Sequence, residues 1–142
     1  VTAGYEKTAH RAGTGYCYEE RDGGFVVPGT INILVFTNKA LTDSAMVKAI
    51  MTITEAKTAA LQDWDAESVK LYPFINEDIP EALTKERKTT ATGTSTDGVI
   101  LTIDTNGDVL TDAGSFSLFG DTLAKAVYVG VQRALSNAIG AE

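Results

Sequence analysis

Two segments of this chain follow the same plan, and that repeated plan limits the fold more than any other feature. In each, a short run of β-branched and apolar residues is followed by a loop and then by a long segment with apolar residues at helical spacing. The strands are predicted at residues 30–37 and 97–104, and the helices at about 43–64 and 117–139. Alternating strands and helices predict an α/β fold with a mixed sheet and two long amphipathic helices. At 142 residues, the whole chain (1–142) fits a single domain.

The helix predictions rest on side chains that recur every three or four residues. Thr42 or Asp43 can cap the first helix with a side-chain oxygen. The expected buried faces are Met46, Ile50, Ile53, Lys57, Leu61 and Trp64 in the first helix, and Phe119, Leu123, Val127, Gly130, Val131, Ala134, Leu135 and Ala138 in the second. Lys57 is the only charged residue on the predicted buried face of the first helix. Either its ammonium reaches solvent beyond an apolar stem, or it serves a functional site.

Two features of the strands lead to further expectations. Residues 30–37, TINILVFT, are nearly all apolar, which suits a strand buried on both faces. Asn106 and Gly107 form a pair that favours a tight hairpin turn. Residues 99–104 are therefore predicted to pair with residues 108–111.

Charge and composition exclude several functional classes. The formal net charge is −7 and the pI is about 4.7, which disfavours binding to nucleic acid or to an anionic membrane. No run approaches the roughly 18 apolar residues of a membrane-spanning helix. Cys17 is the single cysteine, so an internal disulfide is impossible, and a cytoplasmic location is expected.

The chain offers little for cofactor chemistry. It contains one His and one Cys, whereas protein zinc sites draw on several such ligands. The segment GTSTDG lacks the Lys of a phosphate-binding loop and precedes a strand instead of a helix. We therefore expect no metal site and no cofactor belonging to the protein.

The segment TTATGTSTDG at residues 89–98 is rich in hydroxyl groups and is the strongest candidate for a site. Thr94, Ser95 or Thr96 could act as a nucleophile if a base lay within reach, and Asp97 and Lys57 are possible bases. The alternative is an ordinary turn whose hydroxyls satisfy its own backbone. Two further residue types have plain interpretations: His10 fits a surface or hydrogen-bonded role, and Cys17 a half-buried apolar role.

Four short motifs, in this order, resemble the adenosylcobinamide amidohydrolase family of corrinoid-salvage enzymes. They are VTAG at 1–4, PGTINI at 28–33, TEAKTAAL at 54–61 and ATGTSTD at 91–97. The likeness runs from Val1 to about Leu135. It implies hydrolysis of the amide that joins the corrin propionyl side chain to aminopropanol, which yields adenosylcobyric acid. The cobalt would belong to the corrinoid substrate.

The resemblance also implies a set of site residues. The catalytic candidates are Asp97, Glu55 and Lys57, and the substrate-binding candidates are Asn32, Thr54, Gly93, Thr94, Ser95 and Thr96. Our hypothesis is that Asp97 or Glu55 activates water or a loop hydroxyl, while Lys57 holds a carboxylate or protonates the leaving amine. The backbone amides of residues 93–95 would bind the oxyanion. We expect Lys57 and Asp97 to meet in a cavity floored by hydroxyl groups.

Other readings remain open. The resemblance implies a further segment before VTAG, so the domain is expected to lack an upstream part and to form a homo-oligomer or to associate with that part. A non-catalytic module that binds a corrinoid or another amide-rich ligand is the alternative function. A structural oligomerising domain is a third possibility.

Overall fold

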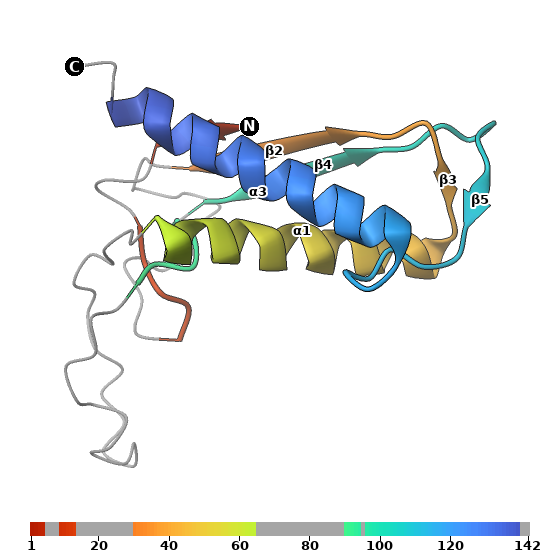
Figure 1. The fold of residues 1–142 in the computed structure, drawn as a ribbon, viewed down its shortest axis with the longest axis horizontal. Helices are drawn as coiled ribbons and strands as arrows, with labels where there is room; N and C mark the ends of the chain where they lie inside the picture. Colours follow the sequence, from red (N-terminus) through yellow and green to blue (C-terminus); the bar gives the residue numbers. More distant parts are fainter. Residues whose placement is uncertain (5–8, 14–29, 65–89, 95, 140–142) are drawn as a thin grey trace, which may run out of the picture.

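The computed structural model describes residues 1–4, 9–13, 30–64, 90–94 and 96–139 (Figure 1). Seven elements lie in these ranges, and Figure 1 labels most of them. In chain order they are β1 (Thr2–Ala3), β2 (Ile31–Phe36), β3 (Ala40–Leu41), α1 (Asp43–Asp63), β4 (Gly98–Thr102), β5 (Val109–Leu110) and α3 (Leu118–Ile139).

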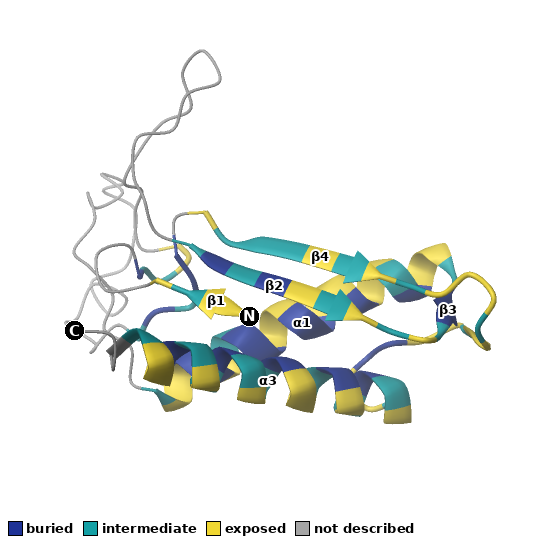
Figure 2. Cartoon of the chain, turned by 90° about the horizontal axis from the view of Figure 1, so that it is seen from above, coloured by how far each residue is buried: buried dark blue, intermediate teal, exposed yellow. Residues whose placement is uncertain are grey.

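The main sheet has the strand order β1-β2-β4. β2 and β4 are parallel, with Asn32 opposite Gly98, whereas β1 is antiparallel to β2, with Thr2 opposite Asn32. A second small sheet joins β3 and β5 in parallel. The helices α1 and α3 pack against each other and cover one face of the main sheet (Figure 2). The predicted α/β fold with a mixed sheet and two long helices is confirmed.

Strand β2 is buried on one face only, so the expectation of burial on both faces is wrong. Ile31 and Ile33 point into the core and are almost fully buried. Leu34 and Phe36 point to the other side, where they are 51% and 74% exposed, and Ile100 of β4 lies 59% exposed. Successive side chains of a strand point to opposite faces. In β2, one set of apolar side chains packs on the helix layer, and the other set is exposed.

Helix α1 begins as predicted. Thr42 is its N-cap, and the Oγ1 atom of Thr42 accepts a hydrogen bond from the Ala45 amide at 3.3 Å. Its buried face is richer in alanine than the predicted stripe: Ala45, Ala49, Thr52, Ile53, Ala56, Lys57, Ala60 and Leu61. Ile50, expected in the core, is 38% exposed. Small side chains let α3 approach closely. Ile53 and Leu61 of the predicted stripe are fully buried, whereas Met46 and Trp64 are only partly buried.

Helix α3 buries the face that its sequence predicts. Leu123, Val127, Val131 and Leu135 are all in the core. A Cβ at Gly120 would lie 1.9 Å from the Gly114 carbonyl oxygen, so glycine is required where the first turn of α3 meets the preceding loop. The second helix is therefore held by an aliphatic stripe and by a close backbone contact.

The predicted hairpin is wrong in its pairing, although the turn forms. The amide of Gly107 donates to the carbonyl of Asp104 at 3.0 Å, which closes the turn. Beyond it, β5 pairs with β3 and not with β4. After the turn the chain runs beside the segment that follows β2, where the Ala40 and Thr42 amides donate to the Asp108 and Leu110 carbonyls, so its main-chain groups pair there and not with the outer edge of β4.

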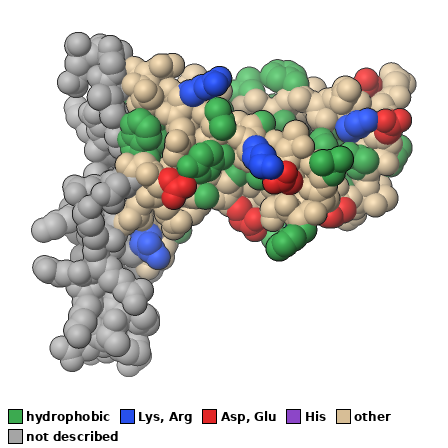
Figure 3. Space-filling model, viewed as in Figure 1, with side chains coloured by type: hydrophobic (Ala, Val, Ile, Leu, Met, Phe, Trp, Pro, Cys, Tyr) green, Lys and Arg blue, Asp and Glu red, His purple; other side chains and the backbone are tan. Residues whose placement is uncertain are grey.

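The outer surface mixes charges of both signs. Figure 3 shows basic and acidic side chains scattered among hydrophobic ones over the face that carries α3. Lys125 and Asp121, one turn apart on α3, form an exposed ion pair at 2.7 Å. Within the described part of the chain, neither helix has a stretch that is long and apolar enough to cross a bilayer.

Candidate functional site

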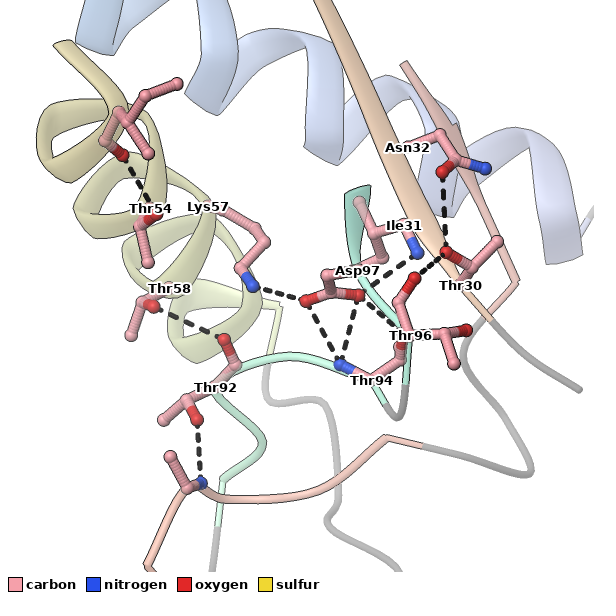
Figure 4. Close-up of polar contacts among 12 residues, drawn as sticks. Thr30, Ile31, Asn32, Thr54, Lys57, Thr58, Thr92, Thr94, Thr96 and Asp97 are labelled. Atoms are coloured by element: carbon pink, nitrogen blue, oxygen red, sulfur yellow. Dashed lines mark hydrogen bonds and ion pairs between the residues drawn. The ribbon is translucent and has the colours of Figure 1, made fainter. Parts of the chain in front are cut away.

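Asp97 is the centre of a polar cluster at the amino-terminal ends of β2 and β4. It immediately precedes β4, and its Oδ1 atom accepts hydrogen bonds from the Ile31 amide at 3.1 Å and from the Thr94 hydroxyl (Figure 4). The Thr94 amide lies 3.2 Å from both carboxylate oxygens. The carboxylate therefore joins the hydroxyl-rich loop to the first residue of β2.

Lys57 meets Asp97 as predicted. The Lys57 ammonium forms an ion pair with Oδ2 of Asp97, and the two side chains are only 11% and 15% exposed. Lys57 lies on the buried face of α1, so its amine turns inward and does not reach solvent past the stripe. Removing one partner of such a largely buried ion pair would leave the other charge without its countercharge.

Gly93 makes this approach possible. A Cβ built at Gly93 would lie 2.5 Å from Oδ2 of Asp97 and 2.9 Å from Nζ of Lys57, both closer than real Cβ contacts. Gly93 is buried. The glycine of the ATGTSTD motif is therefore required because any side chain would occupy the space of the ion pair.

The loop is fastened to distant elements by its hydroxyls and carbonyls. Thr30 donates its hydroxyl to the Thr96 carbonyl at 2.6 Å, and Thr58 of α1 donates to the Thr92 carbonyl at 3.3 Å. The Ala12 amide donates to the Thr92 hydroxyl at 2.9 Å. These contacts cross from one element to another, so the segment is more than a turn that satisfies its own backbone.

His10 lies beside the same loop, which the sequence reasoning did not anticipate. Its amide donates to the Gly93 carbonyl at 2.9 Å, and its carbonyl accepts from the Thr92 amide at 2.9 Å. The Nδ1 atom of His10 is buried and has no hydrogen-bond partner within the described residues. No pattern in the sequence connects residue 10 with residue 93, because only the folded chain brings the two segments together.

Two of the three amides named in the oxyanion hypothesis make hydrogen bonds within the protein, and the hypothesis stays a prediction. The Thr94 amide donates to Asp97, and the Gly93 amide donates to the His10 carbonyl at 3.3 Å. To bind a reacting carbonyl, these two N–H groups would have to exchange these partners for the substrate. Ser95, the third residue, lies outside the described residues.

Not all predicted site residues converge on Asp97. Glu55 is exposed on α1, and because it is two positions from Lys57, it projects from a different side of the helix. Thr54 is also exposed, and its hydroxyl donates to the Ile50 carbonyl at 2.9 Å within the helix. Asn32 lies at the start of the sheet, with Oδ1 3.5 Å from the Thr30 hydroxyl. The geometry thus groups Lys57, Asp97 and Thr94, with Asn32 nearby and Thr54 and Glu55 apart.

A large hollow lies elsewhere. It has a volume of about 640 Å³ and is bordered by residues 35–39 at the carboxyl end of β2 and by the first turns of α3. Lys57 and Asp97 are at the opposite end of the sheet, so this hollow is not theirs, and a cavity shared by the pair stays a prediction. Among the described residues, no group of three or more His, Cys, Asp or Glu side chains is placed to hold a metal ion.

Comparison with known proteins decides the family. The family model for adenosylcobinamide amidohydrolase matches residues 1–72 and 75–142, nearly the whole chain. The chain belongs to the adenosylcobinamide amidohydrolase family. The family assignment agrees with the resemblance carried by the four sequence motifs. No solved structure matches the chain.

Two curated proteins related to this member of the adenosylcobinamide amidohydrolase family come from archaea. An uncharacterized protein of Methanocaldococcus jannaschii is 36% identical over 95% of this chain and 51% of its own length. An adenosylcobinamide amidohydrolase of Methanosarcina mazei is 31% identical over 87% of this chain and 53% of its own length. The chain therefore spans about half the length of these relatives.

Proposed function

We propose that this chain takes part in the hydrolysis of adenosylcobinamide, cleaving the amide to aminopropanol and giving adenosylcobyric acid for corrinoid salvage. Family membership and the name of the Methanosarcina mazei relative, an adenosylcobinamide amidohydrolase, support the reaction. The observation that carries the proposal is the largely buried trio of Lys57, Asp97 and Thr94, for which the missing side chain of Gly93 leaves room. It combines a proton acceptor, a hydroxyl and a proton donor.

The proposed roles follow from the hydrogen bonds. The Thr94 hydroxyl already donates to Asp97, so Asp97 is positioned to take a proton from that hydroxyl or from a water in its place. The oxygen then adds to the amide carbon and the C–N bond breaks. Direct attack by water gives the acid at once, whereas attack by Thr94 leaves an ester that a water must then hydrolyse to release the acid and restore the hydroxyl. In either case a proton must reach the leaving amine. The Lys57 ammonium, beside the same carboxylate, is the donor in this scheme.

Substrate binding is assigned to the polar groups around the trio. A corrinoid carries many amide side chains, which need both hydrogen-bond donors and acceptors. The amide of Asn32 and the exposed Thr96 offer such groups at the same end of the sheet. The cobalt is part of the substrate in this proposal, and the reaction uses no cofactor belonging to the protein.

The test is incubation of the chain with adenosylcobinamide, followed by mass spectrometry and corrin absorption spectroscopy. Release of aminopropanol together with adenosylcobyric acid supports the proposed hydrolysis. A shifted corrin spectrum without product would instead establish the non-catalytic corrinoid-binding alternative. If neither product nor a spectral shift is observed, the proposed hydrolysis and the corrinoid-binding alternative are both contradicted.

The setting of this function is also a proposal. We expect the protein to act in the cytoplasm and to self-associate or to bind a further polypeptide. The relatives support this proposal, because the chain matches only about half of the length of each. Light scattering combined with size-exclusion chromatography measures the self-association directly, and a strictly monomeric chain would contradict the homo-oligomer.

A further inference from the structure

The 640 Å³ hollow lies between the carboxyl end of β2 and the first turns of α3. β1 pairs with the other end of β2, at residues 31 and 32. Val1 packs on α3, since a Cβ at Gly130 would be only 3.0 Å from Cγ2 of Val1. Ala126, Thr122 and Leu118 border the hollow and precede Gly130 at steps of four residues. Residues four apart lie on the same side of a helix, so the hollow continues the row of α3 on which Val1 rests.

Among the described residues, the edge of β2 beside this hollow has main-chain groups that no neighbouring strand pairs with. β1 pairs with β2 only at Asn32 and Ile31 within the described residues. The Thr30 carbonyl faces β1, because it accepts from the Gly4 amide at 3.1 Å, whereas the Thr37 amide faces β4, where it donates to Thr102 at 3.0 Å. Since main-chain groups alternate along a strand, those of Leu34 and Phe36 face the same edge as those of Thr30.

We propose that the hollow is the binding site of an extended polypeptide segment that runs in line with β1 and lies antiparallel to residues 34–37, beyond the pairing of β1 with β2. The hollow is bounded by the edge of β2 and by the row of α3 that contains Leu118, Thr122 and Ala126, an arrangement that suits β-strand addition. Main-chain hydrogen bonds would come from the edge, and specificity from side chains that enter the hollow. The proposal is independent of the proposed hydrolysis.

The register specifies which residues of such a segment must be apolar. Thr2 is opposite Asn32, so Val1 is opposite Ile33, and both Val1 and Ile33 lie on the helix side of the sheet. The residue directly before Val1 would be opposite Leu34 and would point away from the helices. The second residue before Val1 would be opposite Val35 and would point into the hollow, as would the fourth.

The relatives contain polypeptide that could supply the segment. About half of each curated relative lies outside the region that this chain matches. Peptide strands bind such edges when their apolar side chains fill the adjoining pockets. A small flat ligand would use the apolar walls of the hollow but would leave the groups of Leu34 and Phe36 unpaired.

The register provides a test with a matched control. Two forms of the chain carry four residues before Val1, either Val-Thr-Val-Thr or Thr-Val-Thr-Val, which share composition and differ only in which face receives the valines. We expect the first to raise Tm by about 5 °C, because two inward valines are buried, and the second to change it by less than about 1 °C. We also expect about tenfold slower amide exchange at Leu34 and Phe36 in the first form only.

A second substitution distinguishes seating in the hollow from a general effect of a longer strand. Ala126 borders the hollow and is exposed, so Ala126→Lys leaves the core intact while placing a long charged side chain in the space. In this background the advantage of Val-Thr-Val-Thr should disappear. Equal Tm changes in both extended forms, or unchanged exchange at Leu34 and Phe36, would overturn the proposal.

Discussion

At the scale of single residues, the site depends on a glycine and on a buried ion pair. Gly93 leaves room for Lys57 and Asp97 to meet, and Asp97 also holds the Thr94 amide and hydroxyl. The ion pair is therefore part of the loop's architecture as well as of its proposed chemistry. Substitutions at these positions should affect both stability and turnover, so the two effects must be measured separately.

Gly93→Ala should disrupt the ion pair. The new methyl group would lie 2.5 Å from Oδ2 of Asp97, so the carboxylate must shift, and we expect a loss of about 1–3 kcal/mol in unfolding free energy. Turnover of adenosylcobinamide should fall at least about tenfold. Gly4→Ala is the matched control, because nothing lies within 4 Å of a Cβ there. If the two variants behave alike in urea unfolding, the space around Gly93 is not limiting.

Asp97→Asn should abolish turnover while leaving corrinoid binding near normal. The amide cannot accept a proton as a carboxylate does, and it leaves the ammonium of Lys57 without its countercharge. Breaking a buried pair in this way costs about 3–5 kcal/mol, so the variant should also be clearly less stable. Lys57→Met, which removes the ammonium and retains the aliphatic stem, is the second single variant of a double-mutant cycle.

Turnover and binding separate the possible roles of Asp97. The measurements are product formation by mass spectrometry and corrinoid binding by absorption titration, both on folded protein. Undiminished turnover in Asp97→Asn would contradict the assigned role as proton acceptor. The two single variants and the double variant together give the coupling energy of the pair.

At the scale of elements, β2 combines a core face and an uncovered face in one apolar sequence. Ile33 is 1% exposed and Leu34 is 51% exposed, although the two are neighbours of similar size. The helices lie on one side only (Figure 2). Hydrophobic character alone could not separate the two faces, because both contain aliphatic residues.

The matched substitutions Ile33→Ala and Leu34→Ala measure this asymmetry. Ile33→Ala should cost about 2–5 kcal/mol, since it leaves a cavity against the helix layer. Leu34→Ala should change the unfolding free energy by less than about 0.5 kcal/mol, as expected for a surface position. Denaturant unfolding followed by circular dichroism provides both values. A large cost at Leu34 would mean that its face is covered in solution.

At the scale of the whole molecule, the packing of α1 against α3 couples stability to alkaline pH. The Tyr128 hydroxyl of α3 donates to Asp63 of α1 at 2.7 Å, and this hydrogen bond raises the pKa of Tyr128 above its usual 10.0. A phenol whose pKa is higher in the folded state contributes stability below the unfolded pKa. That contribution is lost as the pH rises through the folded value.

Tyr128→Phe should therefore be less stable than the parent at neutral pH, and the difference should shrink as the pH rises beyond about 10. Urea unfolding of both proteins from about pH 8 to about pH 11 measures the difference, and groups other than Tyr128 titrate in both proteins and cancel. Lys125→Ala, which removes an exposed charge elsewhere on α3, is the control. A difference that stays constant across this range would show that the Tyr128–Asp63 contact contributes nothing to the pH dependence.

The sequence by itself determined the two helices, the α/β class and the family. Helical period, capping residues and short motifs are local properties, so they can be read without coordinates: Thr42 caps α1, and the aliphatic stripe of α3 is buried as predicted. The motifs also contain Gly93, Lys57 and Asp97, which the structure brings together. The two-residue spacing between Glu55 and Lys57 also predicts that the two side chains project from different sides of the helix.

Tertiary structure alone decided which groups meet across long sequence distances. It placed His10 against Gly93, engaged the Gly93 and Thr94 amides that the oxyanion hypothesis required, and paired β5 with β3 instead of β4. It also decided that the helices cover only one face of β2. These outcomes depend on how elements compete for the same edges, faces and hydrogen-bonding groups, and that competition is settled only when the whole chain packs.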